Sequence, residues 1–274
     1  MNASVIICTY NAPRELEFGL AGLARQSVPP LEIIIADDGS TDETKAVLDR
    51  WRGRLNCPLI HVWQADKGYR KARIVNEAVR TSKGEQVLFL DGDSFPHHRW
   101  VEDHTTTYKT GLIQIGRRVK LGPKLSPTIT LEDVMAGRFS GLNLMALGSA
   151  LRKDTLYFGL GIRLPRPLTR LLHPQPRRLM GVNYSMPREA FVAVNGYDEA
   201  WTFYGHEDFD IEQRLKRAGY PFRSILNRGI VYHVHHPERA QSEEGGRLIT
   251  KAVNGTYIRC EQGIEGGAAF DPAH

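Results

Sequence analysis

The sequence predicts an α/β protein with a mostly parallel sheet that helices cover on both faces. Over residues 4–90, short apolar runs rich in Val and Ile alternate with segments in which apolar residues recur at helical spacing. This is the pattern of parallel strands joined by crossover helices. Polar and acidic residues follow several of the apolar runs directly. Because ligands bind at the carboxyl ends of the strands in such sheets, the first half of the chain is a candidate nucleotide-binding region.

The first three elements are expected to form a βαβ unit. Residues 4–9 are a largely β-branched run, which predicts a strand. Pro13 suits the first turn of a helix, and leucines at helical spacing extend this helix to about Gln26. A second apolar run at 32–35 predicts the next strand.

A second helix is expected to begin at Ser40, because Ser40 and Glu43 have the spacing of a capping box. It is expected to end near Gly53. The further elements expected in this half are a strand at 59–63, a helix at 69–82 and a strand at 87–90.

The signals weaken after Gly111. Residues 151–179 are rich in Arg, Pro and Leu without clear periodicity, so a mobile or irregular segment is expected there. The later elements expected are helices at about 188–194 and 207–218, a strand at 230–234, and a polar, glycine-containing tail from about Gln241.

Composition favours a soluble, cytoplasmic protein. With 274 residues, of which 41% are hydrophobic, the chain can bury a sizeable core. No run approaches the roughly 18–20 apolar residues that a membrane span needs, and the N-terminus lacks the layout of a signal peptide. Three cysteines without metal-type spacing fit a reducing compartment.

The positive charge is concentrated in one stretch. Lys and Arg number 36 against 31 Asp and Glu, and much of this excess lies between Arg152 and Arg178. A basic patch suits phosphate groups, an acidic glycan or an anionic membrane surface, and a solvated face is the simpler alternative. Nucleic acid is not expected as a partner, because the basic residues lack interleaved aromatic residues.

Two acidic clusters follow predicted strands. Asp37 and Asp38 come after the second strand, where a carboxylate can accept hydrogen bonds from a ribose or a uracil; helix capping is the simpler role for this stretch. Asp91-Gly92-Asp93 follows the strand at 87–90, where the two carboxylates can face a divalent cation that bridges diphosphate oxygens. A plain turn is the alternative there.

Two further clusters lie in the second half. Residues 204–210 open the predicted helix with several carboxylates, of which Asp208 is the first candidate for a general base and Glu207 the second. Acids in a first helical turn are favoured by the helix dipole in any case. In the strand at 230–234, His233 is a candidate metal ligand and His235, on the same face, a weaker one. A structural histidine is the alternative for each.

These clusters, in this order, resemble the glycosyltransferase family 2 pattern over most of residues 3–240. The C-terminal part is similar to the galactosyltransferase-like segment of chondroitin polymerases and polypeptide N-acetylgalactosaminyltransferases. The residues that carry the resemblance are Thr9-Tyr10-Asn11, Asp37-Asp38-Gly39-Ser40-Thr41-Asp42, Gly68-Tyr69-Arg70 with Arg73 and Asn76, Asp91-Gly92-Asp93, Gly196-Tyr197-Asp198-Glu199, Tyr204-Gly205-His206-Glu207-Asp208 and Tyr232-His233.

The resemblance implies a GT-A fold, Rossmann-like, with a nucleoside-diphosphate sugar as donor, most often a UDP-sugar, and a manganese ion, with magnesium as the second choice. It also implies inversion at the anomeric carbon and a glycan or lipid-linked acceptor, as in the synthesis of surface polysaccharides. One catalytic domain is then expected over 1–240, with a donor half at 1–115, an acceptor half at 116–240 and a tail at 241–274. Peripheral membrane contact through the basic segment remains open.

Carried over residue by residue, the resemblance assigns Asp93 and His233 to the metal and Asp208 to the general base, with Glu207 beside it. The residues assigned to the donor are Thr9, Tyr10, Asn11, Asp37, Asp38, Asp66, Gly68, Tyr69, Arg73, Asp91 and Gly92. Relatives show Trp-Gly-Gly-Glu-Asp where this chain has Tyr-Gly-His-Glu-Asp at 204–208, so the identities of sugar and acceptor transfer less well.

Two alternative functions stay open beside this one. A sugar nucleotidyltransferase is disfavoured because a Gly-rich phosphate loop does not follow the first strand. A binding module without catalysis is disfavoured by the retained Asp93, Asp208 and His233.

Further diphosphate contacts are expected from 67–71 and 163–178, and the segment 151–179 is a candidate lid that excludes water from bound donor.

Overall fold

The computed structural model describes residues 2–140, 144–237 and 243–266. Its strands are β1 (Ala3–Thr9), β2 (Glu32–Asp37), β3 (Leu59–Trp63), β4 (Gln86–Asp91), β5 (Ser94–Pro96), β6 (Ile113–Ile115), β7 (Arg117–Lys120), β8 (Asn183–Pro187), β9 (Phe222–Ser224) and β10 (Ile230–His233). Its helices are α1 (Pro13–Ala24), α2 (Asp42–Trp51), α3 (Lys71–Thr81), α4 (Trp100–Thr106), α5 (Leu131–Met135), α6 (Leu144–Leu151), α7 (Arg166–Leu172), α8 (Arg188–Ala193), α9 (Glu207–Arg217) and α10 (Glu243–Asn254), with 3₁₀ turns η1 (Ser126–Thr128) and η2 (Phe158–Gly161).

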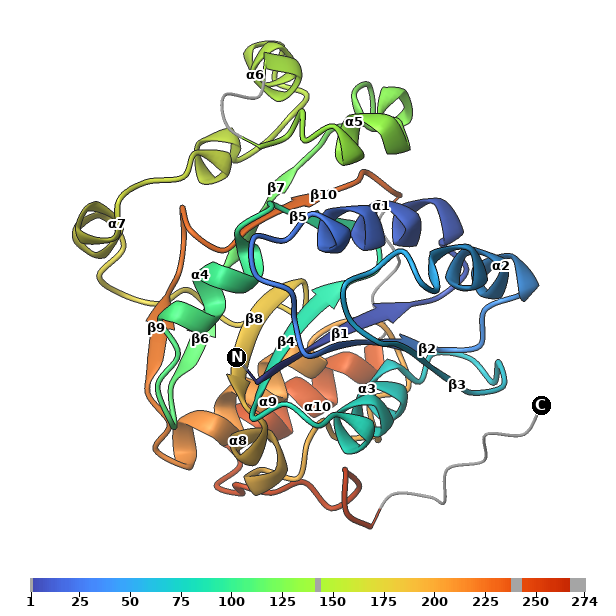
Figure 1. Ribbon diagram of the computed structural model, residues 1–274. Helices are drawn as coiled ribbons and strands as arrows, with labels where there is room; N and C mark the ends of the chain where they lie inside the picture. Colours follow the sequence, from blue (N-terminus) through green and yellow to red (C-terminus); the bar gives the residue numbers. More distant parts are fainter. Residues whose placement is uncertain (1, 141–143, 238–242, 267–274) are drawn as a thin grey trace.

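The main sheet has seven strands in the order β3-β2-β1-β4-β8-β6-β9. Strands β3, β2, β1 and β4 run parallel, β8 runs antiparallel to both of its neighbours, and β6 pairs parallel with β9. The sheet is therefore mostly parallel and carries helices on both sides (Figure 1). The predicted α/β class with a mostly parallel sheet is confirmed.

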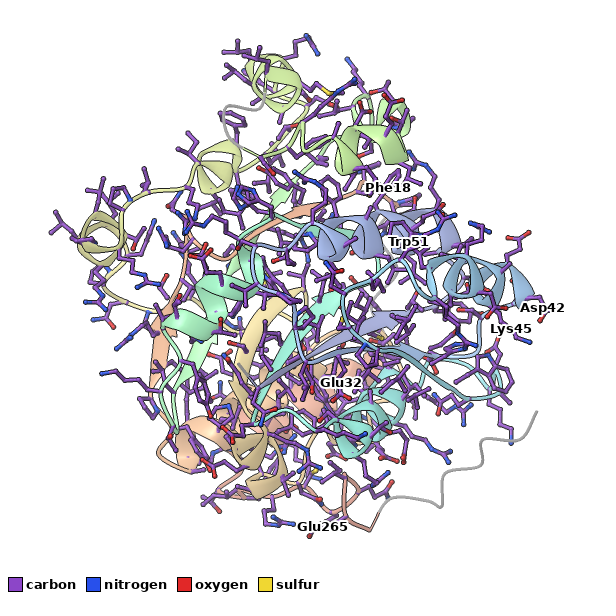
Figure 2. The ribbon with its side chains drawn as sticks, in the orientation of Figure 1. Phe18, Glu32, Asp42, Lys45, Trp51 and Glu265 are labelled. Carbon is purple, nitrogen blue, oxygen red and sulfur yellow. The ribbon has the colours of Figure 1, made fainter. Side chains whose placement is uncertain are left out.

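Alternation along β1 divides the core into two layers. Val5 and Ile7 face one cluster together with residues of α1 and α2, whereas Ile6 faces the other with residues of α3, α8 and α9. In the first layer the Trp51 indole reaches across from α2 to α1 and donates a hydrogen bond to Glu17 (3.2 Å; Figure 2). A buried run with apolar residues on both faces is what a central parallel strand requires.

A second sheet of three strands, in the order β5-β10-β7, lies beside the carboxyl end of β4. Its antiparallel register places His233 of β10 opposite Ser94 of β5. The Val234 amide also donates to the Asp93 carbonyl (3.0 Å). This pairing joins the turn after β4 to a strand that lies about 140 residues later in the sequence.

The predicted capping box at Ser40 is wrong. Helix α2 begins at Asp42 with Thr41 at its N-cap, and no side chain caps it. The Ser40 hydroxyl accepts a hydrogen bond from the Asn11 amide instead (2.9 Å). Ser40 therefore binds the loop that follows β1 instead of capping α2.

The two segments predicted to be irregular contain regular structure. Residues 151–179 include η2 and α7, and the stretch predicted as a tail contains α10, which packs against α9. Asn195 holds the chain beyond α10 by donating to the carbonyl of Cys260 (2.8 Å) and accepting from the Glu265 amide (2.8 Å). Residues 238–242, where the predicted tail begins, lie outside the described residues.

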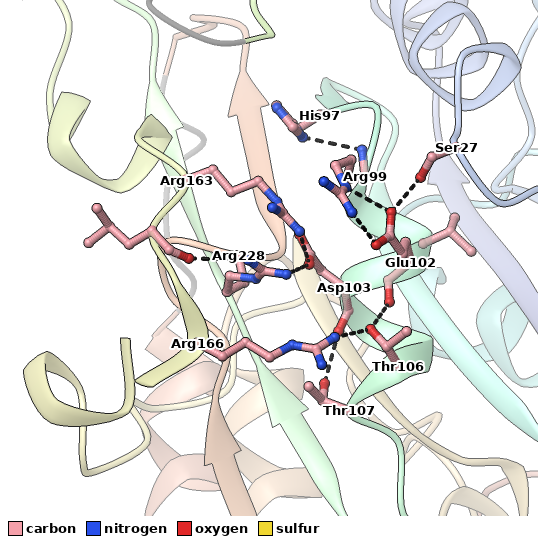
Figure 3. A network of polar contacts seen from close by, with 12 residues as sticks. Ser27, His97, Arg99, Glu102, Asp103, Thr106, Thr107, Arg163, Arg166 and Arg228 are labelled. Atoms are coloured by element: carbon pink, nitrogen blue, oxygen red, sulfur yellow. Dashed lines mark hydrogen bonds and ion pairs between the residues drawn. The ribbon is translucent and has the colours of Figure 1, made fainter. Parts of the chain in front are cut away.

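A charged cluster anchors the segment between α6 and β8 to α4. The fully buried Asp103 carboxylate accepts two hydrogen bonds from Arg163 (2.7 and 3.1 Å) and forms an ion pair with Arg228 (2.7 Å; Figure 3). Asn227 adds hydrogen bonds to the carbonyls of Gly159 and Ile162. The middle of the predicted lid is therefore fastened to the body, and the lid itself stays a prediction.

Replacing Asp103 by Asn is expected to lower the free energy of unfolding by about 3 kcal/mol, because two guanidinium groups then lose their buried counter-charge. In a chain of this size each kcal/mol corresponds to roughly 2–4 °C in melting temperature, which thermal denaturation measures. Glu102→Gln is the matched control, since its pair with the 40% exposed Arg99 lies at the surface and is worth about 1 kcal/mol or less. Equal losses from both variants would show that the Asp103 cluster is not a special anchor.

Candidate active site

A cleft of about 760 Å³ opens where β1 and β4 end. Its opposite wall comes from β7 and from the end of β10. Among the residues that line it are Thr9, Tyr10, Asn11, Asp38, Gly68, Tyr69, Lys71, Asp91, Gly92, Asp93, Arg118, Lys120, Tyr204, His233, His235 and His236. The structure therefore brings most of the residues assigned from the sequence to one place.

Asp93, His233 and His236 form a cluster at one end of this cleft. The Asp93 Oδ2 atom lies 3.4 Å from His233 Nε2 and 3.1 Å from His236 Nε2. One donor atom from each of the three residues lies within 4.8 Å of the others. Burial raises the pKa of the Asp93 carboxyl, but hydrogen bonds with the two imidazoles outweigh this and hold it well below its usual range. The cluster is thus a ready carboxylate and imidazole donor set.

Sequence reasoning singled out Asp93 and His233 but missed His236. It treated 230–234 as a strand and used strand alternation to weigh His235 as the second histidine. Strand β10 ends at His233, so alternation no longer applies beyond it. His235 is exposed and lies outside the cluster, although it lines the cleft. The signal that could have identified His236 is its position three residues after His233, just beyond the end of the strand.

Gly92 is required by close packing at the end of β1. Its amide donates to the Cys8 carbonyl (2.7 Å), and a Cβ atom at this position would lie 2.8 Å from that same oxygen. Any larger residue would push the turn away from β1 and move Asp93 with it.

The two adjacent aspartates after β2 have different positions. Asp38 lines the cleft, where its carboxylate accepts hydrogen bonds from Gln64 (2.6 Å) and the Arg70 amide (2.8 Å). Asp37 is buried beneath it and bonds the Ser40 amide (2.8 Å) and His61 (2.9 Å). The sequence left both open as donor ligands, and only Asp38 faces the cleft.

Asp66 and Arg73 do not line the cleft. Asp66 is exposed and accepts hydrogen bonds from the Tyr10 hydroxyl (2.9 Å) and the Gly68 amide (3.0 Å), so it holds the rim in place. Arg73 lies on α3 and interacts electrostatically with Glu199. The spacing of residues along the motif did not reveal which face of α3 Arg73 occupies.

Lys71 connects the cleft to the carboxylates behind it. Its ammonium lies 3.3 Å from Asp91 and 3.2 Å from Glu207. Burial lowers the pKa of Lys71, but the carboxylates of Asp91 and Glu207 outweigh it and hold the pKa well above its usual value. Glu207 is almost fully buried, and its Oε1 also accepts from the Tyr69 hydroxyl (2.9 Å). Its Oε2 is buried without a hydrogen-bond partner among the described residues.

Asp208 lies near Lys71 and Gly181 and is not one of the residues that line the cleft. Its two oxygens accept hydrogen bonds from the Tyr197 hydroxyl (2.6 Å) and the Gly181 amide (2.7 Å). Burial raises the pKa of Asp208 to about 6, against the opposing effect of the Lys71 ammonium. A carboxyl with this pKa exchanges protons near neutral pH, as a general base does.

The fold is the GT-A arrangement known from glycosyltransferases, as expected from the sequence. Residues 4–126 match the family described as Glycosyl transferase family 2, and residues 173–237 match that described as N-terminal domain of galactosyltransferase. The first match covers the strands that end at the cleft, and the second covers β8, α9 and β10. The predicted resemblance is confirmed.

Two curated relatives and one solved structure illustrate the similarity. The chain is 28% identical to chondroitin synthase of Pasteurella multocida (strain Pm70), over 91% of this chain and 26% of that protein. It is 29% identical to validoxylamine A glucosyltransferase of Streptomyces hygroscopicus subsp. limoneus, over 80% of this chain and 48% of that protein. The fold is similar to that of GalNAc-T7 with UDP, GalNAc and Mn²⁺ (TM-score 0.62, 13% identity, 92% of this chain and 48% of that chain). The chain thus spans about half or less of these proteins.

Among the described residues, every helix is too short or too polar to cross a membrane.

Proposed function

We propose that this chain transfers a sugar, with inversion, from a nucleoside-diphosphate sugar to a hydroxyl group of a glycan or lipid-linked glycan, and that it uses a divalent metal. The observation that carries the proposal is the meeting of Asp93, His233 and His236 in the cleft that also holds Thr9 and Asp38. A nucleoside bound near Thr9 and Asp38 would have its diphosphate in the same cleft as these donors. A UDP-sugar is the first candidate donor, in line with the UDP in the GalNAc-T7 structure.

The three donors fit a divalent transition metal such as Mn²⁺ better than Mg²⁺. Two imidazoles and one carboxylate are a mixed nitrogen and oxygen set, whereas Mg²⁺ prefers oxygen ligands alone. Asp93, His233 and His236 would hold the metal through three protein donor atoms. A bound cation supplies the charge that stabilises the leaving diphosphate. Arg118 and Lys120, which line the same cleft, add positive charge on the acceptor side.

In this proposal Asp208 takes the proton from the acceptor hydroxyl as that oxygen attacks the anomeric carbon. A single displacement breaks the bond between the sugar and the diphosphate and inverts the anomeric carbon. The hydroxyl would donate to one of the two carboxylate oxygens, each of which keeps a second acceptor site beside its hydrogen bond from the Gly181 amide or the Tyr197 hydroxyl. Hydrogen bonds of catalytic groups commonly rearrange when the substrate binds.

A donor screen tests the proposed function. Thermal unfolding is measured with UDP-, dTDP- and GDP-sugars, each with and without Mn²⁺, and release of the nucleoside diphosphate is followed with glycan acceptors. We expect stabilisation by one donor only with metal, and turnover of that donor. Stabilisation without turnover would favour the binding module, whereas pyrophosphate release from a nucleoside triphosphate and a sugar phosphate would favour the nucleotidyltransferase.

We expect kcat to fall about tenfold per pH unit below about pH 6, because the raised pKa of Asp208 means that its base form is lost there. An aspartate with an ordinary pKa would keep full activity to about pH 4. Since protonated imidazoles release metal, Mn²⁺ binding is measured over the same range and the rates are taken at saturating metal. A profile that stays flat to pH 5 would count against Asp208 as the base.

Replacing Lys71 by Met is expected to move this acidic limb to higher pH, because the Lys71 ammonium lowers the pKa of Asp208. The measurement is the pH profile of kcat for the two proteins. Lys67→Met is the matched control, since Lys67 is exposed on the loop that precedes α3. A limb that stays in place in the Lys71 variant would show that the two groups are not coupled.

A further inference from the structure

The outer surface of residues 144–172 is unusually apolar. Of the fourteen large hydrophobic residues that are exposed among those described, eight lie in this stretch: Leu144, Leu151, Leu156, Tyr157, Ile162, Leu168, Leu171 and Leu172. Soluble proteins usually expose such residues singly, and a concentration of them indicates an interaction surface.

Both helices of this stretch turn their leucines outward. In α7, Leu168, Leu171 and Leu172 have the spacing of one helical face, and the last two are 76% and 54% exposed, whereas Thr169 is buried. In α6, Leu144 and Leu151 are 69% and 78% exposed, whereas Ala146 and Ser149 are buried. Helices on the surface of a globular protein normally bury their apolar face. Figure 1 shows both helices at the outer margin of the molecule, away from the main sheet.

The net positive charge of the chain is concentrated in this stretch and the six residues that follow it. Residues 144–178 contain seven Lys or Arg against one Asp, a net charge of +6, whereas the whole chain has +5. Arg163 and Arg166 are engaged with α4. Five others are exposed, namely Arg152, Lys153, Arg170, Arg177 and Arg178. Leucines that alternate with exposed cations are the composition of helices that lie in the interface of anionic membranes.

We propose that α7, together with α6 and the basic residues around them, binds the surface of an anionic lipid bilayer. The leucines enter the boundary between head groups and acyl chains, and the arginines bind lipid phosphates. A second copy of the chain fits this surface less well. A two-fold contact places the same patch against itself, and here it would bring together two stretches of net charge +6.

The membrane surface connects directly to the cleft. Leu156 and Lys120 exchange backbone hydrogen bonds (2.9 and 3.0 Å), and Lys120 lines the cleft. At the other end of the segment the Gly181 amide contacts Asp208. A bilayer bound here therefore lies on the acceptor side, where it can present a lipid-linked acceptor; this last point rests on the proposed function.

Vesicle binding tests the inference without donor, acceptor or metal, so its outcome is independent of the proposed transfer reaction. The protein is sedimented with phosphatidylcholine vesicles that contain or lack phosphatidylglycerol. We expect binding to the anionic vesicles only, weakening with salt because surface charges are screened. Absence of binding to anionic vesicles would overturn the proposal.

Two variants identify the surface. Changing Leu168, Leu171 and Leu172 together to Ser is expected to weaken vesicle binding at least about tenfold, because their apolar surface no longer enters the bilayer. Arg170→Glu with Arg177→Glu is expected to weaken it about twenty-fivefold or more, since each basic residue contributes about fivefold.

The matched controls are Val253→Ser, an exposed apolar residue on α10, and Arg52→Glu with Arg54→Glu at the end of α2. Both should bind vesicles like the unmodified chain, and circular dichroism checks that all variants fold. Equal binding by the α7 variants would contradict the proposal. So would a dimer in lipid-free solution that the leucine substitutions dissociate while vesicle binding stays unchanged.

Discussion

Replacing Asp93 by Asn is expected to lower kcat/KM about a thousandfold or more, since losing about 4 kcal/mol of charge stabilisation in the transition state has that effect. The substitution removes the one carboxylate of the donor set, which accepts from His233 and His236 in the structure. Metal removal by a chelator should have a similar effect that added Mn²⁺ reverses. Calorimetric titration with Mn²⁺ measures the loss of metal affinity directly.

The neighbouring histidines supply the controls for this result. His236→Ala should weaken Mn²⁺ binding markedly, because its Nε2 belongs to the cluster, whereas His235→Ala should leave the affinity for Mn²⁺ close to that of the unmodified chain. Asp93→Asn should not change the melting temperature by more than a few degrees, since the turn is held by backbone contacts. Undiminished transfer by Asp93→Asn in the presence of a chelator would refute metal dependence.

Replacing Asp208 by Asn is expected to lower kcat about 100- to 10,000-fold with little change in donor affinity, because the amide cannot take up the acceptor proton. Asn keeps the size of the side chain and a carbonyl oxygen for the Tyr197 hydroxyl, so positioning is disturbed as little as possible. Steady-state rates and donor binding are measured on the same preparation.

Glu207→Gln separates the two candidate bases. Glu207 already accepts from Tyr69 and pairs with Lys71, so its loss should disturb the cleft and raise KM more than it lowers kcat. If the Glu207 variant loses kcat while Asp208→Asn keeps it, Glu207 becomes the candidate base through its Oε2 atom, which has no hydrogen-bond partner in the described part of the chain. Whichever variant lacks the true base should also lose the fall in kcat below about pH 6 that the unmodified enzyme is expected to show.

Local patterns were sufficient for the order of the elements from β1 to β4. The strands at 4–9 and 32–35 are buried runs, and Pro13 opens α1 as expected. Where another part of the chain competes for a side chain, local patterns failed. Ser40 binds Asn11 rather than capping α2, and α10 forms in a stretch whose polar composition suggested a tail.

The candidate site shows the same division. The turn that presents Asp93 could be read from the sequence, because acidic residues directly follow a buried strand. Which residues share its cleft depends on faces and registers that no local pattern contains. Asp38 faces the cleft and Asp37 does not, although both follow the same strand. Arg73 is on α3, as is Lys71, but only Lys71 reaches the cleft.

By itself the sequence determined that apolar periodicity builds an α/β sheet and that carboxylates and histidines follow its strands. The tertiary structure alone decided which of them meet. The pairing of β10 with β5 sets His233 opposite Ser94, and the chain's exit from that strand brings in His236. Strand registers are fixed by packing over the whole sheet, so contacts between residues about 140 positions apart become visible only once the chain is folded.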